Sequence, residues 1–274
     1  MKITNNKNRP EEFIKAIKFY QPKPERMSTT HLIDEPLIRT LQIEKWDDII
    51  VDVSDFTLML LGISFHKYIG EFGDEFAEHK FEDKVDSLMV VGKADLYKVE
   101  TQSIEDWKVT SVWTLVYESR VKEWEKQLNV YAWQHRKRGL KVTKLVVHAI
   151  LRDWSESRAL KNKDYPQNDF VSIEIPLWSF EQQEKYIKDQ IQFHLMNPKG
   201  ECSPESKWQK ETAYAVMKKG RKSALRVFDE EVKAIDYQVG YNKSTYIEKR
   251  LGECLRCKKY CLVRSVCEYA KGDK

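Results

Sequence analysis

Two aspartates and a lysine are the residues of this chain best suited to chemistry. Asp106 and Lys108 stand two residues apart, and Asp95 lies a short distance upstream. Side chains two apart on a strand point to the same face, so Asp106 and Lys108 share a side while Trp107 points away. Carboxylates on rigid strands suit Mg²⁺ or Mn²⁺, which accept a phosphate oxygen as a further ligand. We therefore expect metal-assisted hydrolysis of a phosphodiester, with Lys108 supplying positive charge.

Three more side chains are candidates for the same site. Gln127 and Tyr131 are four residues apart in an expected helix, so they lie on one face and can present an amide and a phenol to a phosphate. They could instead belong to the core stripe of that helix. His66 lies in an apolar helical run, where a histidine is either a hydrogen-bonded core residue or a metal ligand.

Periodicity predicts the elements that position these residues. Residues 84–99 and 104–110 alternate between apolar and polar and predict an antiparallel hairpin. The other expected elements are helical segments within 28–69, at 120–138 and at 180–194, and strands at 142–151 and 171–177. This order predicts an α/β fold in which a mixed β-sheet is flanked by helices.

Composition narrows the class of protein. A chain of 274 residues with 41% hydrophobic content can bury a substantial core. It has no run of about 18 apolar residues and no secretory leader, so we expect no membrane span and a cytoplasmic location, in a bacterial host cell. The net charge is only +4. Positive charge gathers in two stretches of the last quarter, 218–226 and 250–264, although these could be solvated faces. The residues that we expect to bind nucleic acid are Lys218, Lys219, Arg221 and Lys222.

The five cysteines all lie beyond residue 200. Closely spaced cysteines in a cytosolic chain ligate metal more often than they form disulfides. Cys257, Cys261 and Cys267, together with Cys202 upstream, supply four thiolates for a [4Fe–4S] cluster or a tetrahedral Zn²⁺ ion. Cys254 is an alternative fourth ligand, and the spacing alone leaves both metals open.

The motifs occur in an order that resembles the RecB-like branch of the PD-(D/E)XK nuclease superfamily, especially its phage-encoded members. The resemblance rests on His66, Gly92-x-x-Asp95, Asp106-x-Lys108 and Gln127-x-x-x-Tyr131, and extends to ILRDW at 150–154, YPQ at 165–167 and the Cys-rich tail. It implies a restriction-endonuclease-like core with a helical N-terminal layer over residues 27–196. A flexible N-terminus, 1–26, would precede this core and a metal-stapled lobe, 197–274, would follow it.

The resemblance also implies roles for individual residues. His66, Asp95 and Asp106 would bind the catalytic metal, with the backbone carbonyl of Trp107 as an additional ligand. Lys108 would be the catalytic lysine. The helix motif beside the site would consist of Gln127 and Tyr131. The second acid is Asp106 where many relatives have Glu, and both are carboxylates.

The cysteines gain an assignment from the same resemblance. RecB-like nucleases often attach the C-terminus to the core through an iron–sulfur cluster with one distant and three late cysteines. The resemblance therefore implies a [4Fe–4S] cluster on Cys202, Cys257, Cys261 and Cys267, with Zn²⁺ as the alternative. Cys254 would then be a spare thiol.

The expected function is that of a Mg²⁺-dependent DNA exonuclease serving phage recombination or repair. DNA would be its substrate, and a single-strand annealing or recombination protein is a candidate partner. Two alternatives stay open. One is a CRISPR-associated RecB-like exonuclease, although the place of Cys202 after the core argues against it. The other is a catalytically silent nucleic-acid-binding scaffold.

Overall fold

The computed structural model describes residues 1–72, 78–118, 120–241 and 244–270. The chain forms two compact units, residues 1–200 and residues 201–274. Within the described residues, no helix is long and apolar enough to cross a bilayer.

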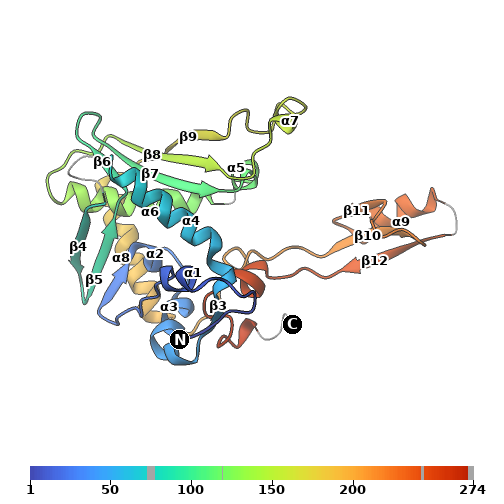
Figure 1. Ribbon diagram of the computed structural model, residues 1–274, viewed down its shortest axis with the longest axis horizontal. Coiled ribbons are helices and arrows are strands. Elements are labelled where there is room, and N and C mark those ends of the chain that lie inside the picture. The colour runs from blue at the N-terminus through green and yellow to red at the C-terminus, as the bar shows by residue number, and fades with distance from the viewer. Residues whose placement is uncertain (73–77, 119, 242–243, 271–274) are drawn as a thin grey trace. The chain divides into compact units, whose positions relative to one another are not determined.

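The main sheet of the first unit has four strands and is mixed (Figure 1). In order across the sheet they are β6 (Leu96–Lys98), β7 (Ser103–Thr110), β8 (Lys144–Leu151) and β9 (Phe170–Ile175). The pairs β6–β7 and β8–β9 are antiparallel, whereas β7 and β8 are parallel. The parallel pair needs a crossover, which the two helices between these strands provide.

Smaller sheets and helices complete the first unit. β5 (Leu88–Lys93) lies between β2 (Arg26–Ser28) and β4 (Lys80–Val85), while β1 (Lys2–Thr4) pairs with β3 (Ile50–Asp52). The helices are α1 (Glu11–Ala16), α2 (Thr29–Leu32), α3 (Pro36–Glu44), α4 (Thr57–Gly70), α5 (Val112–Val116), α6 (Val121–Arg136), α7 (Glu156–Ala159) and α8 (Phe180–Met196). Two 3-10 turns, Trp46–Asp48 and Val53–Phe56, join α3 to α4 through β3.

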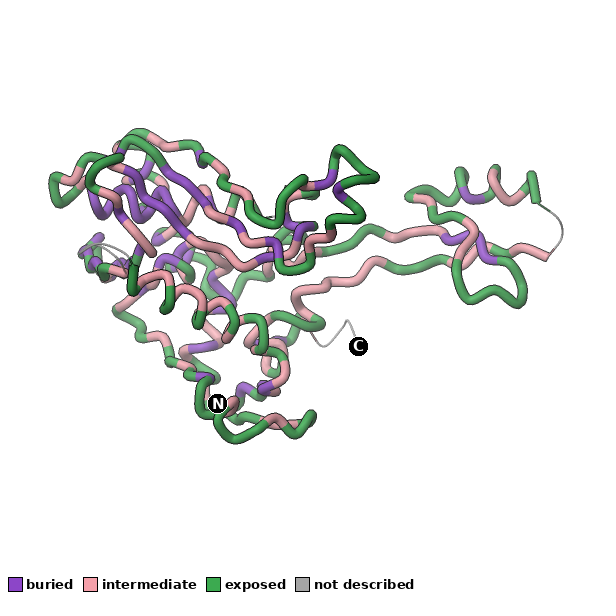
Figure 2. Tube along the Cα trace, turned by 45° about the horizontal axis from the view of Figure 1, so that its top comes forward, coloured by how far each residue is buried: buried purple, intermediate pink, exposed green. Residues whose placement is uncertain are grey.

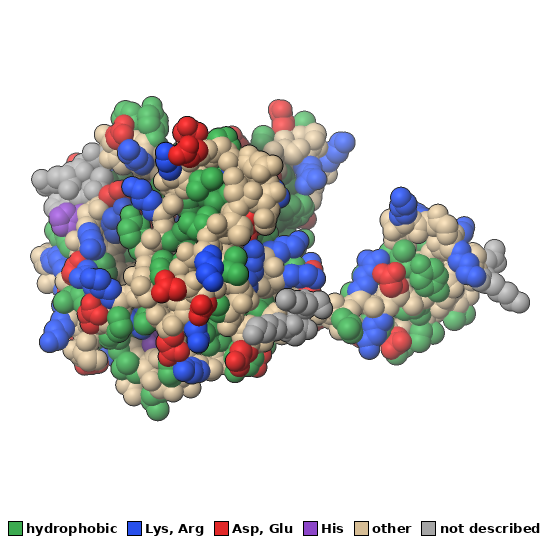
Figure 3. Space-filling model, turned by 60° about the horizontal axis from the view of Figure 1, so that its bottom comes forward, with side chains coloured by type: hydrophobic (Ala, Val, Ile, Leu, Met, Phe, Trp, Pro, Cys, Tyr) green, Lys and Arg blue, Asp and Glu red, His purple; other side chains and the backbone are tan. Residues whose placement is uncertain are grey.

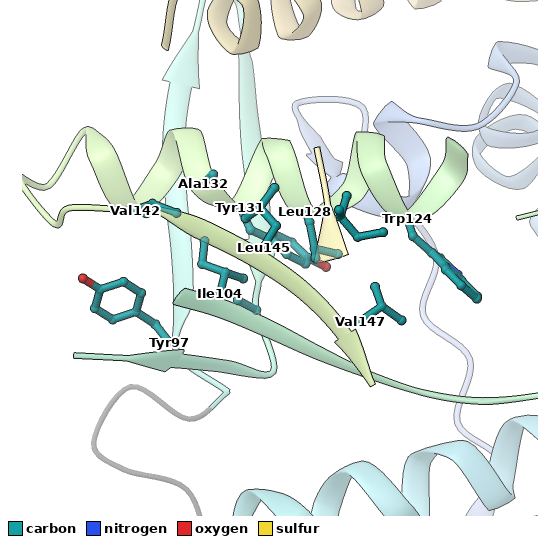
Figure 4. Packing of buried hydrophobic residues seen from close by; sticks show 11 residues of the cluster. Tyr97, Ile104, Trp124, Leu128, Tyr131, Ala132, Val142, Leu145 and Val147 are labelled. Atoms are coloured by element: carbon teal, nitrogen blue, oxygen red, sulfur yellow. The ribbon is translucent and has the colours of Figure 1, made fainter. Parts of the chain in front are cut away.

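Helix α6 is the centre of the first unit because it is apolar on two sides. On one side Leu128 and Ala132 belong to the core cluster that includes Ile104, Leu145 and Val147 of the sheet (Figure 4). On the other side, a second cluster joins α6 to α8, β2 and β5 through Val130, Trp133, Ile187, Ile191, Met27 and Val90. Burial of two apolar faces fixes α6 firmly above the sheet.

Helix α4 contrasts with α6. Its sequence is strongly apolar, yet none of its residues is buried. Figure 2 shows this difference between α4 and the buried central strands. α4 nevertheless contacts β7, and the ring of Phe65 lies 5.9 Å from that of Trp107.

The predicted α/β class is confirmed, with mixed sheets flanked by helices. One difference concerns residues 84–99, expected as a single strand. They contain the end of β4, then β5 and β6, because Asp86 adopts a positive φ of 52° in a tight turn and the chain leaves one sheet for the next after Lys93. Residues 1–26 include β1, paired with β3, and α1, while the expected flexibility of this segment stays a prediction.

The second unit is built on a three-stranded antiparallel sheet. β10 (Ala213–Lys218) lies between β11 (Arg226–Phe228) and β12 (Thr245–Arg250), and α9 (Glu231–Val239) packs against it. A π-helical turn, Arg256–Tyr260, follows β12. The small core of this sheet includes Ala215, Val216 and Ala234.

Candidate active site

The candidate site lies at the edge of β7, where its neighbour β6 stops. β6 begins at Leu96, which pairs with Glu105, so the following residues of β7 have no partner from β6. Asp95 precedes β6, and its Oδ2 accepts a hydrogen bond from the backbone N–H of Trp107 at 2.8 Å. A carboxylate thus takes the place of a strand partner, and it brings Asp95 beside Asp106.

A chain of polar contacts joins β7 to α6. Lys108 Nζ lies 2.6 Å from Asp106 Oδ2 and donates a hydrogen bond to Gln127 Oε1 at 3.3 Å. Gln127 Nε2 in turn donates to the hydroxyl of Tyr131 at 2.9 Å. The shared face of Asp106 and Lys108, and that of Gln127 and Tyr131, therefore meet as the two periodicities predict.

His66 reaches the same place from α4. Its Nδ1 lies 3.0 Å from Asp95 Oδ2. The structure therefore brings together six residues that the sequence singled out: His66, Asp95, Asp106, Lys108, Gln127 and Tyr131. Trp107 takes part through its backbone, while its ring lies on the opposite face of the sheet, 4.6 Å from the ring of His148.

Burial controls the charges of the two aspartates. Asp106 is only 2% exposed, and this burial raises its pKa above the usual range, against the opposing effect of Lys108. Burial also disfavours ionisation of Asp95, but the hydrogen bond from His66 and the nearby positive charges outweigh it and lower the pKa of Asp95. The hydrogen bond to Asp95 raises the pKa of His66. The unequal environments of the two aspartates thus move their pKa values in opposite directions.

Asp106 Oδ2 is a buried carboxylate oxygen, and its partner is Lys108 Nζ at 2.6 Å. Burying a carboxylate is costly, and the ammonium of Lys108 compensates part of that cost. Within the described residues, no three His, Cys, Asp or Glu side chains are arranged to hold a metal ion as they stand. The donor chemistry of Asp95, Asp106 and His66 nevertheless fits a divalent cation.

Sequence reasoning missed a second polar network on the other face of the same sheet. His148 Nε2 lies 3.0 Å from Glu105 Oε2, and His148 Nδ1 lies 2.8 Å from Ser172 Oγ. Burial opposes ionisation of Glu105, but hydrogen bonds from His148, Lys98 and Ser103 lower its pKa to about 2. Strand alternation alone could have placed Glu105 opposite Asp106, whereas the contact to His148 depends on the β7–β8 register.

The cysteines all lie in the second unit, and none of them forms a disulfide. Residues 207–210 lie along residues 253–256, since Lys210 N donates to Glu253 O and Gln209 pairs with Cys254. Burial opposes the charge of Lys207, but its hydrogen bond to Glu201 and the nearby Cys254 and Cys257 raise the pKa of Lys207. Gly252 is required in this segment because a Cβ there would lie 1.9 Å from the carbonyl oxygen of Lys210. Cys261 ends the π-helical turn, and Cys267 is buried.

The predicted nucleic-acid-binding cations are exposed. Lys218 ends β10, and the other three follow in the connection to β11: Lys219, Arg221 and Lys222. Arg221 Nε donates a hydrogen bond to Ser223 Oγ at 3.2 Å. Elsewhere, positive and negative side chains alternate over the face in Figure 3.

Comparison with known proteins gives only remote likenesses. No protein-family model matches the sequence, and no curated protein matches it. The crystal structure of SSO0001 aligns over 66% of this chain and 82% of its own, with a TM-score of 0.43 and 14% identity. A phage-related exonuclease from Haemophilus somnus 129PT aligns over 58% and 69%, with a TM-score of 0.29 and 12% identity. Likenesses this remote establish neither a fold family nor an activity for this chain.

Proposed function

We propose that this chain is a metal-dependent nuclease that hydrolyses phosphodiester bonds of DNA. The observation that carries the proposal is the meeting of two aspartates and a lysine at the edge of β7, where the buried Asp106 is ion-paired with Lys108. Carboxylates that can hold a metal ion, next to a fixed ammonium group, are what metal-assisted phosphodiester hydrolysis requires.

Each residue has a distinct role in this proposal. Asp95, Asp106 and His66, with the carbonyl of Trp107, would hold Mg²⁺ or Mn²⁺. When bound, this ion would polarise the phosphate and activate a water molecule. Lys108 places its ammonium beside the negative charge that develops during cleavage. The other pair positions Lys108, since the Gln127 amide holds its Nζ and the Tyr131 hydroxyl anchors Gln127.

Within nucleases we favour a RecB-like DNA exonuclease acting in phage recombination or repair. The order of the motifs supports this finer assignment, and the exposed cations at 218–222 can contact DNA phosphates. A single-strand annealing or recombination protein remains a candidate partner. A CRISPR-associated exonuclease and a silent nucleic-acid-binding scaffold are the alternatives that experiment must separate.

The cysteines would hold a structural metal group in the second unit. Thiols are the donors that iron–sulfur clusters and Zn²⁺ select. We propose Cys202, Cys257, Cys261 and Cys267 as ligands of a [4Fe–4S] cluster, with Zn²⁺ as the alternative. Cys254 shares the surroundings of Cys257 beside Lys207, so it competes for a ligand position.

The decisive experiment compares cleavage of labelled linear and circular DNA in Mg²⁺ and in EDTA. We expect Asp106→Asn, which keeps the side-chain shape, to lower the rate by roughly 10²- to 10³-fold or more, the range for losing one transition-state stabiliser. The matched control is Glu105→Gln, which changes the neighbouring acid on the opposite face and should retain activity.

The outcomes separate the candidates. Cleavage of linear DNA alone supports the exonuclease, and cleavage of circular DNA supports an endonuclease. Binding without cleavage by the unmodified protein would support the silent scaffold. Undiminished cleavage by Asp106→Asn would show that the chemistry occurs elsewhere.

A further inference from the structure

Two exposed aromatic rings form a stacked pair on α5. The rings of Trp113 and Tyr117 have centroids 5.8 Å apart and an interplanar angle of 20°. Trp113 is 40% exposed and Tyr117 is 71% exposed. Large aromatic side chains usually gain stability by burial, so a stacked pair left in solvent is a feature that a ligand with a flat ring can use.

A guanidinium and a third ring complete this arrangement. The guanidinium carbon of Arg158, from α7, lies 5.7 Å from the centroid of the Trp113 ring. The buried ring of Tyr165 meets Trp113 edge-on at 6.2 Å. Trp113 is therefore held from the side by Tyr165 and lies beside a positive charge.

The two motifs without a role in the nuclease site build this arrangement. Asp153 of ILRDW accepts hydrogen bonds from Ser111 Oγ at 2.6 Å and Val112 N at 2.7 Å, and so fixes the start of α5. Trp154 donates through Nε1 to the carbonyl of Pro166, in YPQ, at 2.7 Å. The hydroxyl of Tyr165 accepts from Ser155 N at 3.1 Å. These contacts order the loops around α5 and hold the ring pair in place.

The ring pair lies close to the candidate site along the chain. α5 begins directly after β7, and Trp113 follows Lys108 by five residues. Five residues span at most about 17 Å even when fully extended. A nucleic acid strand whose phosphate lies beside Lys108 can therefore place a base, a few nucleotides away, at the rings.

We propose that Trp113 and Tyr117, with Arg158, bind an unpaired base of the substrate strand next to the phosphate that is cut. This inference rests on the proposed nuclease function and adds to it a preference for single-stranded or frayed ends. The base extends the stack on Tyr117, the more exposed ring, because every base has a flat face that stacks on an aromatic side chain. Arg158 supplies a cation for the same strand.

An unpaired base fits these residues better than a base pair does. A base within a duplex already stacks on its neighbours, and its face becomes accessible only when the strand is frayed or single. A protein partner would be expected to cover the rings with apolar contacts, whereas Arg158 and the open face of Tyr117 suit a polar, planar and negatively charged chain.

The test measures binding of the full-length protein to fluorescein-labelled oligo(dT) and to a blunt duplex of equal length, with EDTA replacing Mg²⁺ so that no cleavage occurs. We expect Tyr117→Ala and Trp113→Ala to weaken oligo(dT) binding roughly 10-fold or more, as for loss of one base–aromatic stack. Duplex binding should change less than about 2-fold. Tyr117→Phe keeps the ring and should bind like the unmodified protein.

The matched control is Tyr20→Ala, which removes another tyrosine that is largely exposed, at 79%. It should leave both affinities unchanged. Thermal unfolding of each variant identifies any that fail to fold, and Tyr117→Ala removes only an exposed ring. Unchanged oligo(dT) affinity in Tyr117→Ala, or equal losses for oligo(dT) and duplex, overturns the proposal.

Cleavage assays keep this proposal separate from the nuclease assignment. If the unmodified protein binds oligo(dT) through these rings but cuts no DNA, the proposed function fails and the base site stands. If the unmodified protein cuts DNA and this cleavage depends on Asp106, but Tyr117→Ala binds and cuts oligo(dT) normally, the base site fails and the nuclease assignment stands.

Discussion

At the scale of single residues, Gly92 shows how closely β5 packs against α6 next to the candidate site. A Cβ at this position would lie 1.9 Å from Gln134 Oε1 and 3.0 Å from Thr29 Oγ1. Gln134 is fully buried and donates through Nε2 to Asp83 Oδ2 at 3.1 Å. The glycine of the Gly92-x-x-Asp95 motif therefore makes room for a buried side chain of α6.

We predict that Gly92→Ala lowers the free energy of unfolding by about 1–3 kcal/mol, because the added methyl group forces Gln134 out of a buried polar network. Urea denaturation measures the change. Gly62→Ala is the control, since a Cβ there meets nothing within 4 Å and alanine is the better helix former. Equal effects of the two substitutions would contradict this explanation.

The same residue scale shows what sequence could reveal of the site. Asp106 and Lys108 share a face through the strand period, and Gln127 and Tyr131 share one through the helix period, so their side chains could be grouped in advance. The hydrogen bond from Trp107 N to Asp95 could not be foreseen. It depends on where β6 begins, and this is set by tertiary packing and not by local sequence.

At the scale of elements, α6 combines apolar and polar burial. Its last turns include Gln134 and His135, both essentially inaccessible to solvent. His135 lies against the rings of Phe81 and Tyr97, at 4.7 and 5.1 Å, and its Nδ1 lies 2.7 Å from the carbonyl oxygen of Tyr131. The neutral ring donates its Nδ1 proton to that carbonyl, and burial lowers its pKa to about 4.

This burial predicts a pH-dependent stability. The folded pKa of His135 lies below its ordinary value of 6.5, so the folded state binds fewer protons than the unfolded state. The contribution of neutral His135 to the free energy of unfolding is fully present above about pH 6.5. It is lost as the pH falls towards 4, and the total loss is roughly 3 kcal/mol. Unfolding free energies of the native protein and His135→Gln, measured across this range, should differ in slope. Parallel pH profiles would rule this assignment out.

Elements differ in how well sequence predicts them. The helices expected at 120–138 and 180–194 correspond to α6 and α8, and the strand expected at 142–151 corresponds to β8, because their periodicity is long and regular. Residues 84–99 were harder, since a turn and a change of sheet interrupt an apolar run without a glycine or proline to mark the turn. Short α5 lacks any periodic signal, so the contact between its two rings and the nearness of Arg158 do not follow from sequence.

At the scale of the whole molecule, every cysteine lies within residues 201–274 and every residue of the candidate active site within residues 1–200. Metal binding to thiolates contributes free energy to the folding of the part that holds them. A structural metal group would therefore stabilise the second unit and leave the chemistry of the first unit to other residues.

This separation gives a prediction for metal removal. Cys257→Ser, or prolonged chelation, should increase hydrogen exchange in residues 201–274 while exchange in β7, β8 and α6 stays close to that of the native protein. Lys210→Met, in the same segment but without a thiol, serves as the control variant. Absorption near 400 nm and metal analysis distinguish iron from zinc. Uniform loosening of both units, or no change in either, would contradict a structural metal in the second unit.

The carboxylate of Asp95 that closes the edge of β7 has one more consequence. Its Oδ2 accepts a hydrogen bond from a main-chain N–H that would otherwise lack a partner. Asp106 Oδ2, by contrast, accepts no hydrogen bond from the backbone of the described residues. A lineage that abandoned the chemistry would therefore be free to drift at Asp106 first. It would keep Asp95 long afterwards, so an intact first acid in a descendant would be no proof of a working enzyme.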